Sequence, residues 1–566
     1  MLKFKVIPKC YQDASQYADA DADFLLENDN WNDFSYCTTY HLHTTKKTDP
    51  NAGARYLGVV HIMHKGQEIY KNGLKISEFN KLDEEYCSIC WELDLYSAIN
   101  RLLNADQRKE FAAALRLVTG IDTPWYDEFS QEECFQKSFL RYADIDSFVL
   151  QKGRQLLFNE ARLYNLRKKS FKVSVSNCTQ PIELRFPALN NDVQIDKAPD
   201  GMIAFIGHNG SGKSTLLYTI AKVLYASPTT RKLLESQITI APKDLGVMQL
   251  MMFSYSAFDN FVLPWLSIEE YKIHAQERNL EEERFIFCGL RDTRKEAKIA
   301  IERINEWHKE NPEKNANKEF RSYLSKRTNN IVLKHPELLG REVADAFKGI
   351  ISDGTKNDLL KQIIEGCRKH NVALYSELAF LTDVWVAVEN DEIMKSFIKM
   401  STGHKFFTHA MTHLIAYLQD DSIVLFDEPE NHLQPCLLSY MMQCIRQVAA
   451  LRNSVVLVAT HSPVVLQEMM SDNIFVIRRD GDTINVSHPE IQTFGANFGM
   501  INSHVFDLTG DVTLFRNVIE ELFNAWCKTD MDPTCATEII EERAGTTLSP
   551  QMAAYVMSLC CDYKEE

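Results

Sequence analysis

At roughly 150 residues per domain, the 566 residues of the sequence correspond to three or four domains. Hydrophobic residues make up 45% and charged residues 25%, a globular composition that excludes wholesale disorder. The net charge of −16 argues against a broad surface that coats nucleic acid, although a local basic groove needs only a few lysines and arginines.

The amino terminus, MLKFKVIPKC, carries scattered lysines and lacks the apolar core of a signal peptide. No stretch reaches about 18 uninterrupted apolar residues, so we expect no transmembrane helix and no membrane contact. The sequence is therefore interpreted as cytoplasmic, and its 14 cysteines are expected to be reduced thiols.

Residues 1–165 are predicted to form a mixed region, with strands first and helices after them. Alternating β-branched and aromatic residues in YCTTYHLHTT and RYLGVVHIMHKG predict strands, and DQRKEFAAALRLV has helical spacing. A metal site shared by His41, His43, Cys87 and Cys90 is conceivable, but CSIC is a lone cysteine pair without a partner at zinc-site spacing. We interpret these four as ordinary strand and core residues.

The segment 166–260 is predicted to be the first part of a nucleotide-binding head. Two short strands, FKVSVS and IELRF, precede GMIAFIGHNGSGKSTLLYTIAKVL, in which 202–206 reads as a buried strand and 214–224 as a helix. The connection fits G-x-x-x-x-G-K-[ST], whose glycines let successive N–H groups point at phosphate oxygens. Lys213 would reach the β and γ phosphates, and Ser214 would bind Mg²⁺. The residues predicted to contact the nucleotide here are His208, Asn209, Gly210, Ser211, Gly212, Lys213, Ser214 and Thr215.

The segment 261–394 is predicted to be a helical insertion. DTRKEAKIAIERINEWHKE places its apolar residues at helical spacing and its charges elsewhere. Basic and acidic residues are mixed in similar numbers, so a solvated helical surface is favoured over a DNA contact.

The segment 395–510 is predicted to complete the head, and 511–566 to form a helical tail. SIVLFDEPENHL, SVVLVATHSP and NIFVIRR are short apolar strands separated by helical stretches, which favours an α/β fold with a mixed, largely parallel sheet and flanking helices. Asp427 would hold Mg²⁺, and Glu428 could polarise the attacking water as a general base. His461, at the end of VLVATH, could sense the γ-phosphate through a hydrogen bond.

The stretch MSTGHKF lies between the phosphate loop and the two acids. Ser401, Thr402 and Gly403 precede a helix-like run, so their hydroxyl and N–H groups would form a second anion cradle at a helix N-terminus. Alone, this stretch is a helix cap of low specificity.

The order of these motifs resembles the head of an ABC-class ATPase. In that family the signature of one subunit closes over the ATP held by another. The resemblance implies that Ser401 and Gly403 contact ATP in trans and that ATP-bound heads pair two-fold. It also implies Mg²⁺-dependent ATP hydrolysis with Glu428, His461 and Lys213 as the catalytic residues.

DEPENHLQP is similar to the branch that contains RecF-like and overcoming-lysogenization-defect ATPases. FSYSAFDNF, FIFCGLRD, TFGANFGMINSHVFDL and NDNWNDFSYCTTYHL look like the stand-alone defence ATPases of bacteria, most of all the PtuA type. That family occurs in Septu systems and in retron systems that encode an HNH nuclease partner, PtuB. The resemblance implies a regulatory ATPase that pairs with itself and gates a separate HNH nuclease, with DNA or a retron RNA–DNA hybrid as a further candidate partner.

One feature departs from the ABC pattern. Such heads usually carry a glutamine at the end of the strand after the phosphate loop. Here LMMFSYSAFD ends in Ser254, Ser256 and Asp259, and Gln249 lies too early on the strand. The group that completes the Mg²⁺ and water shell is therefore left open.

Three alternatives share the head motifs. A self-contained nuclease of the overcoming-lysogenization-defect type would need a Toprim domain, for which the tail after His461 is too short and too helical. DMDP, at 530–533, is the tail's acidic stretch and is interpreted as a helix-capping turn. A RecF- or RecN-like DNA-repair clamp is mildly disfavoured by the acidic charge, and a transporter head by the long N-terminal region and the D-loop.

Overall fold

A computed structural model describes most of the chain. The described residues are 1–10, 14–29, 35–50, 53–141, 143–160, 166–168, 170–186, 201–226, 231–242, 245–257, 261–265, 268–275, 280, 283–311, 316–325, 331–383, 390–506, 514–527 and 531–562. Within them, no helix is both long and apolar enough to cross a membrane.

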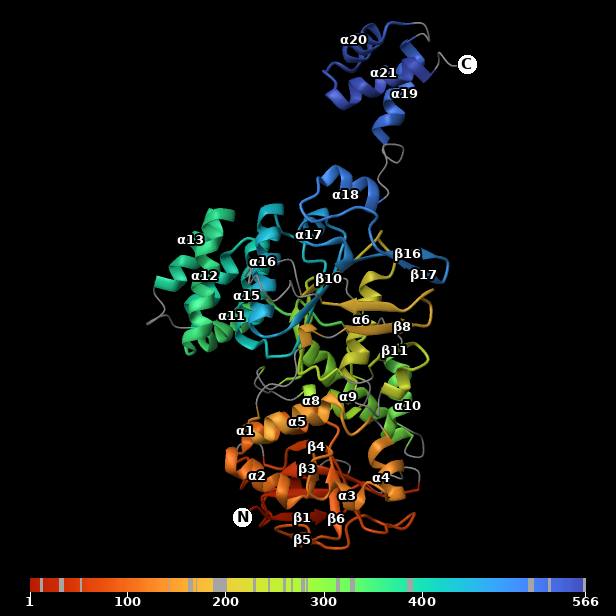
Figure 1. Ribbon diagram of the computed structural model, residues 1–566. Helices are drawn as coiled ribbons and strands as arrows, with labels where there is room; N and C mark the ends of the chain where they lie inside the picture. Colours follow the sequence, from red (N-terminus) through yellow and green to blue (C-terminus); the bar gives the residue numbers. More distant parts are fainter. Residues whose placement is uncertain are drawn as a thin grey trace.

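The amino-terminal region is built on a seven-stranded sheet with the order β5-β1-β2-β3-β4-β6-β7. Helices α1, α2 and α5 share one buried core with the strands, and α3 and α4 pack against a second core (Figure 1). The bounds are β1 (Phe4–Ile7), β2 (Phe24–Asn28), β3 (Thr39–Thr44), β4 (Tyr56–His64), β5 (Glu78–Phe79), β6 (Tyr86–Ile89), β7 (Leu117–Val118), α1 (Leu93–Leu102), α2 (Ala105–Ala114), α3 (Tyr126–Phe129), α4 (Glu133–Lys137) and α5 (Phe148–Phe158).

The cysteine and histidine pairs of this region do not converge on a metal site among the described residues. Cys87 packs in the core that contains α3 and α4, whereas Cys90 packs in the core on the other side. His43 is buried on β3, where its Nε2 lies 3.0 Å from Glu27 Oε2. These are strand and core residues.

A second seven-stranded sheet forms the head, with the order β13-β12-β14-β15-β10-β16-β17. All neighbours are parallel except β16 and β17, which form an antiparallel pair. Both faces of its central strands are buried, which is why they read as continuous apolar runs. The bounds are β10 (Met202–Ile206), β12 (Leu250–Ser254), β13 (Phe285–Gly289), β14 (Ile423–Asp427), β15 (Val455–Thr460), β16 (Ile474–Asp480) and β17 (Thr483–Ser487).

Helices cover both faces of this sheet (Figure 1). Helices α11 to α18 share one core with the strands, and α6, α8, α9 and α10 share the other. The bounds are α6 (Lys213–Tyr225), α8 (Ile268–Ala275), α9 (Thr293–Glu310), α10 (Ala316–Ser325), α11 (Pro336–Ile351), α12 (Gly354–His370), α13 (Val372–Asp383), α14 (Asn390–Lys399), α15 (Thr402–Tyr417), α16 (Pro435–Leu451), α17 (Pro463–Gln467) and α18 (Phe498–Val505).

Two smaller units complete the described chain. A three-stranded antiparallel sheet contains β8 (Ser170–Val175), β9 (Ile182–Arg185) and β11 (Ile238–Ala241), and the first two are the predicted strand pair FKVSVS and IELRF. Helices α19 (Leu514–Trp526), α20 (Pro533–Ala544) and α21 (Pro550–Asp562) form a bundle with a small core of its own, drawn at the top of Figure 1.

The segment 261–394, predicted to be a helical insertion, contains strand β13 in addition to its helices. This strand pairs with β12 at the edge of the head sheet, so Phe285 lies opposite Leu250 and Gly289 opposite Ser254. FIFCG is a short, fully buried apolar run, and periodicity cannot separate such a strand from a buried helix. Pairing with β12 therefore decides its conformation.

A buried ion pair joins the amino-terminal region to the head. Lys152 Nζ, on α5, lies 2.6 Å from Asp421 Oδ2, just before β14, and both side chains are buried. The amide of Asn453 donates a hydrogen bond to the other oxygen of Asp421. Two buried charges cancel here, and removing one would leave the other without its partner.

We therefore predict that Lys152→Met lowers the free energy of unfolding by about 3 kcal/mol, because the Asp421 carboxylate stays buried without a cation. A fall in the midpoint of thermal unfolding, measured by calorimetry, checks this. Lys137→Met is the matched control, since Lys137 pairs with Glu133 at an exposed position where such pairs contribute little. Equal midpoints for the two variants would contradict the assignment.

Candidate nucleotide site

The strand register places the predicted site residues at one edge of the head sheet. Ile206, the last residue of β10, lies opposite Thr460, and Asp427, the last of β14, lies opposite Ala459. The residues that follow these strand ends are Gly207, where the phosphate loop starts, Glu428 and His461. Carboxyl ends of parallel strands are where α/β folds bind ligands.

The phosphate loop runs from β10 into α6, and its glycines meet two different demands. A Cβ on Gly207 would lie 2.2 Å from the carbonyl oxygen of Ile477, so no larger residue fits there. Gly212 is the N-cap of α6 with φ of +101°, a conformation that strongly favours glycine. The loop therefore turns tightly and delivers the positive N-terminus of α6 to its concave side.

Two polar groups of the loop fit a phosphate ligand. Lys213 is 5% exposed, and its Nζ donates to the carbonyl oxygens of Gly207 at 2.9 Å and His208 at 3.1 Å. Burial lowers the pKa of Lys213. The Ser211 hydroxyl is buried and has no hydrogen-bond partner within the described part of the chain. A buried polar group without a partner is costly, and phosphate oxygens would satisfy it.

Ser214 and Asp427 meet at the carboxyl end of β14. The Ser214 hydroxyl donates to Asp427 Oδ1 at 2.9 Å, and the hydroxyl of Tyr218 donates to Oδ2. The Tyr218 ring is held by stacking on Phe261, with ring centroids 3.7 Å apart. A hydroxyl and a carboxylate side by side are the oxygen donors that Mg²⁺ takes in phosphate-loop proteins, so these residues fit the predicted ion.

Glu428 follows Asp427 in a strained conformation, with φ of +49°. Its Oε2 accepts a hydrogen bond of 3.1 Å from the side-chain amide of Asn431, and its Oε1 lies 3.8 Å from His461 Nδ1. The side chain is 31% exposed. Glu428 therefore lies at the same sheet edge as the phosphate loop, and its carboxylate remains accessible to a water molecule.

Glu430 is a site residue that the sequence analysis passed over. One of its oxygens accepts from the Thr460 hydroxyl at 2.8 Å and from the His461 N–H at 2.7 Å, and it lies 3.1 Å from His461 Nδ1. Burial raises the pKa of this carboxyl, and its other oxygen has no partner among the described residues. Glu430 thus holds His461 more closely than Glu428 does. The sequence signal that could have identified Glu430 is the second glutamate of EPE.

The signature stretch lies at the surface. The Ser401 hydroxyl accepts from the N–H of His404 at 3.3 Å and so caps α15, while Ser401 and Thr402 are exposed. A Cβ on Gly403 would lie 2.4 Å from the carbonyl oxygen of His432, which packs the start of α15 against the segment after Glu428. Among the described residues, no hydrogen bond joins Ser401 or Thr402 to the phosphate loop of the same chain.

The structure explains why Gln249 is unsuitable for the site. It lies at the amino end of β12, fully buried, where its amide donates to the carbonyl oxygen of Glu283 at 3.1 Å and accepts from the Gln419 N–H at 3.2 Å. Ser254 instead lies at the carboxyl end of the strand, opposite Asp427. Asp259 lies outside the described residues.

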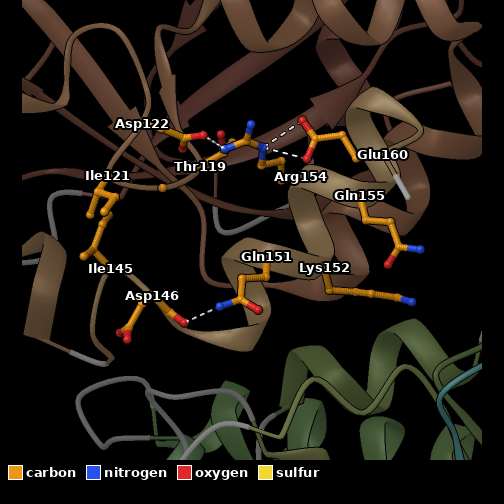
Figure 2. A pocket seen from close by; sticks show the side chains of 11 residues that line it. Thr119, Ile121, Asp122, Ile145, Asp146, Gln151, Lys152, Arg154, Gln155 and Glu160 are labelled. Atoms are coloured by element: carbon orange, nitrogen blue, oxygen red, sulfur yellow. Dashed lines mark hydrogen bonds and ion pairs between the residues drawn. The ribbon is translucent and has the colours of Figure 1, made fainter. Parts of the chain in front are cut away.

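A separate pocket of about 510 Å³ lies in the amino-terminal region, away from these residues (Figure 2). Its two basic side chains already form ion pairs, Lys152 with Asp421 and Arg154 with Asp122 and Glu160. It therefore offers little unpaired charge to a ligand.

The fold and the loop together define a P-loop ATPase domain, and the predicted α/β class with a largely parallel sheet is confirmed. Residues 284–467 match the family described as "AAA domain, putative AbiEii toxin, Type IV TA system". The matched segment contains Asp427, Glu428 and His461 and begins after the phosphate loop.

The matching proteins include one from a phage and one solved structure. Protein ea59 of Escherichia phage lambda is 27% identical over 497 residues, which cover 85% of this chain and 86% of that protein. Among solved structures, the crystal structure of the SmcHead bound to the C-winged helix domain of ScpA covers 56% of this chain and 96% of its own, at 11% identity and a TM-score of 0.24. A score at that level carries no argument about this molecule.

The buried acid of the site predicts a specific pH dependence. Burial raises the pKa of Asp427 to about 6, above the ordinary 3.8, so the folded protein holds a proton that the unfolded chain releases between these values. Stability is therefore lost as pH rises through this range, by up to about 3 kcal/mol. Asp427→Asn should remove this loss and raise the thermal midpoint at pH 7 but not at pH 4.

Calorimetry at pH 7 and pH 4, without nucleotide or Mg²⁺, measures the difference in thermal midpoint between variant and parent. Asp482→Asn is the control, because Asp482 is fully exposed in the β16–β17 turn. If Asp427→Asn raised the thermal midpoint by the same amount at both pH values, the proton would not be held at this carboxyl.

Proposed function

We propose that the chain is an ATP-binding and ATP-hydrolysing subunit whose heads pair around nucleotide to regulate a partner nuclease. The observation that carries the proposal is the meeting of the phosphate loop, Asp427, Glu428 and the Glu430–His461 pair at one sheet edge. Together these interactions concentrate buried charge beside an anion cradle.

The chain's own residues divide the chemistry between them. Loop N–H groups and Lys213 would hold the phosphates, and Ser214 with Asp427 would hold Mg²⁺, which neutralises phosphate charge when bound. Glu428 would take the proton of the attacking water. Glu430 would keep His461 oriented through its 3.1 Å contact with Nδ1, so that the opposite ring nitrogen faces away from this carboxylate.

Pairing of two heads is supported by the position of the signature. Ser401 and Thr402 are exposed at the N-terminus of α15, a helix of 16 residues, and within the described part of the chain they make no hydrogen bond to their own phosphate loop. An exposed, capped helix terminus suits an anion presented by another molecule. In a two-fold dimer each head would thus supply the signature for the nucleotide held by its partner.

A role in antiphage defence, with an HNH nuclease as the regulated partner, is the finer part of the proposal. It rests on the resemblance of several sequence stretches to PtuA-type ATPases. In this scheme ATP shifts the equilibrium between open and paired heads by its higher affinity for the paired form. Slow hydrolysis would return the heads to the open state.

We predict that Glu428→Gln lowers ATP turnover by about 100-fold or more, because the general base is lost, while ATP binding remains. The variant should then accumulate as an ATP-loaded dimer, seen by sedimentation with and without ATP and Mg²⁺. Lys213→Ala is the control, since loss of a charged phosphate contact should weaken ATP binding roughly 10- to 100-fold and leave the heads unpaired. Unchanged turnover in Glu428→Gln would contradict the assignment of the base.

The partner is tested by purifying tagged Glu428→Gln from its own host and identifying bound proteins and nucleic acids. Recovery of a small HNH protein with Glu428→Gln, and less of it with Lys213→Ala, supports nucleotide-gated regulation. A homodimer without a nuclease, whose ATP turnover rises on added DNA, would favour the DNA-repair clamp instead.

A further inference from the structure

A cluster of three metal-ligating side chains lies inside the head, away from the nucleotide residues. His409 and His413 are four residues apart on α15 and therefore share one helix face, with ring centroids 4.0 Å apart. Glu342 projects from α11, and its Oε2 lies 3.2 Å from His409 Nε2. One ligand atom from each of the three lies within 4.8 Å of the other two. Both imidazoles are buried.

We propose that Glu342, His409 and His413 form a binding site for one divalent transition-metal ion of the Zn²⁺ type, which fastens the signature helix α15 to α11. Two imidazole nitrogens and one carboxylate oxygen are a donor set found in zinc sites, whereas Mg²⁺ and Ca²⁺ prefer oxygen donors alone. This metal site shares no residue with the nucleotide site, and its occupancy does not depend on ATP binding.

The hydrogen bonds around the two rings show which nitrogen of each could bind an ion. His413 Nδ1 lies 2.8 Å from the carbonyl oxygen of His409, which can only accept, so this nitrogen carries the proton and Nε2 presents its lone pair. His409 Nδ1 lies 2.7 Å from the hydroxyl of Tyr255, which can accept as well as donate. In this structure Nε2 carries the proton, because the Glu342 carboxylate 3.2 Å away can only accept, and the Tyr255 hydroxyl donates to Nδ1. An ion would take the place of the Nε2 proton, Nδ1 would then carry it and donate to the Tyr255 oxygen, and this kind of outer hydrogen bond orients metal-binding histidines.

Binding one ion requires the three side chains to move closer together. Two donors about 2.1 Å from a tetrahedral zinc ion are about 3.4 Å apart, so a pair at the 4.8 Å limit of the cluster has to approach by about 1.4 Å. Side-chain rotation within packed helices can supply such a shift. The Glu342 side chain is 23% exposed, while those of the two histidines are nearly inaccessible, so the carboxylate marks the side from which an ion would enter.

Lys334 is the group that opposes the ion. Its Nζ lies 2.8 Å from Glu342 Oε1 and 2.9 Å from Oε2, and its side chain is only 7% exposed. A carboxylate has about four lone-pair positions, so the ammonium can remain on Oε1 while the ion takes Oε2. The positive charge would nevertheless lower the affinity, which gives the proposal a distinctive test: removal of Lys334 should strengthen binding.

The test uses the full-length chain, purified without nucleotide, with Zn²⁺ measured by mass spectrometry after dialysis and Co²⁺ titrated as a spectroscopic probe. We expect about one Zn²⁺ per chain and the visible absorption of Co²⁺ bound to imidazole. His413→Gln and Glu342→Gln should remove both signals, and Lys334→Met should bind Co²⁺ more tightly than the parent. Lys213→Ala should retain the ion, which separates this site from the nucleotide site.

His274→Gln is the matched control, because His274 is a buried head histidine that lies 3.5 Å from Glu283 without belonging to the cluster. It should leave the Zn²⁺ content unchanged. Circular dichroism confirms that each variant is folded, and Tyr255→Phe, which removes only the outer hydrogen bond, should weaken Co²⁺ binding about tenfold. The proposal is overturned if the parent chain holds no Zn²⁺ and no Co²⁺, or if His413→Gln and Lys334→Met bind as the parent does.

Discussion

The parallel register of β12, β14, β15 and β10 is the constraint on which the candidate site depends. Because these strands end level with one another, Asp427 lies opposite both Ser254 and Ala459, and Ile206 lies opposite Thr460. The chain then leaves the sheet four times at the same edge, and each exit carries a polar group. A slip of one residue in any strand would exchange its buried faces and move its polar end away from the phosphate loop.

Buried charged groups with unfavourable pKa shifts lie together at this edge of the head. The carboxyls of Asp427 and Glu430 both have raised pKa values, and the pKa of Lys213 is lowered, all mainly because they are buried. Such groups cost folding stability, so their presence favours a functional reason. The amino-terminal junction differs, because Lys152 and Asp421 neutralise one another directly. Buried charges therefore have different roles at these two sites. The Lys152–Asp421 pair joins the amino-terminal region to the head, whereas the groups at the sheet edge are arranged for a ligand.

The sequence was sufficient for strands β10, β14 and β15 and for most residues that meet at their ends, because the phosphate-loop spacing and the apolar runs before Asp427 and His461 are local signals. It was insufficient where partners distant in sequence decide the outcome. Strand β13 was hidden in a helical segment until its pairing with β12 was known. Glu430 was missed because its role depends on Thr460 and His461, on another strand. The cluster of Glu342 with α15 likewise requires the packing of two helices.

The central claim is that each nucleotide is completed by the signature of a second copy, and mixing two inactive variants tests it most directly. Lys213→Ala disables the phosphate loop, and Ser401→Arg, at an exposed position, blocks the signature. Each variant alone should show little ATP turnover. In mixed dimers one of the two sites combines an intact loop with an intact signature, so turnover should reappear on mixing. If the mixture is no more active than the sum of its parts, the signature does not act in trans and the paired-head account is wrong.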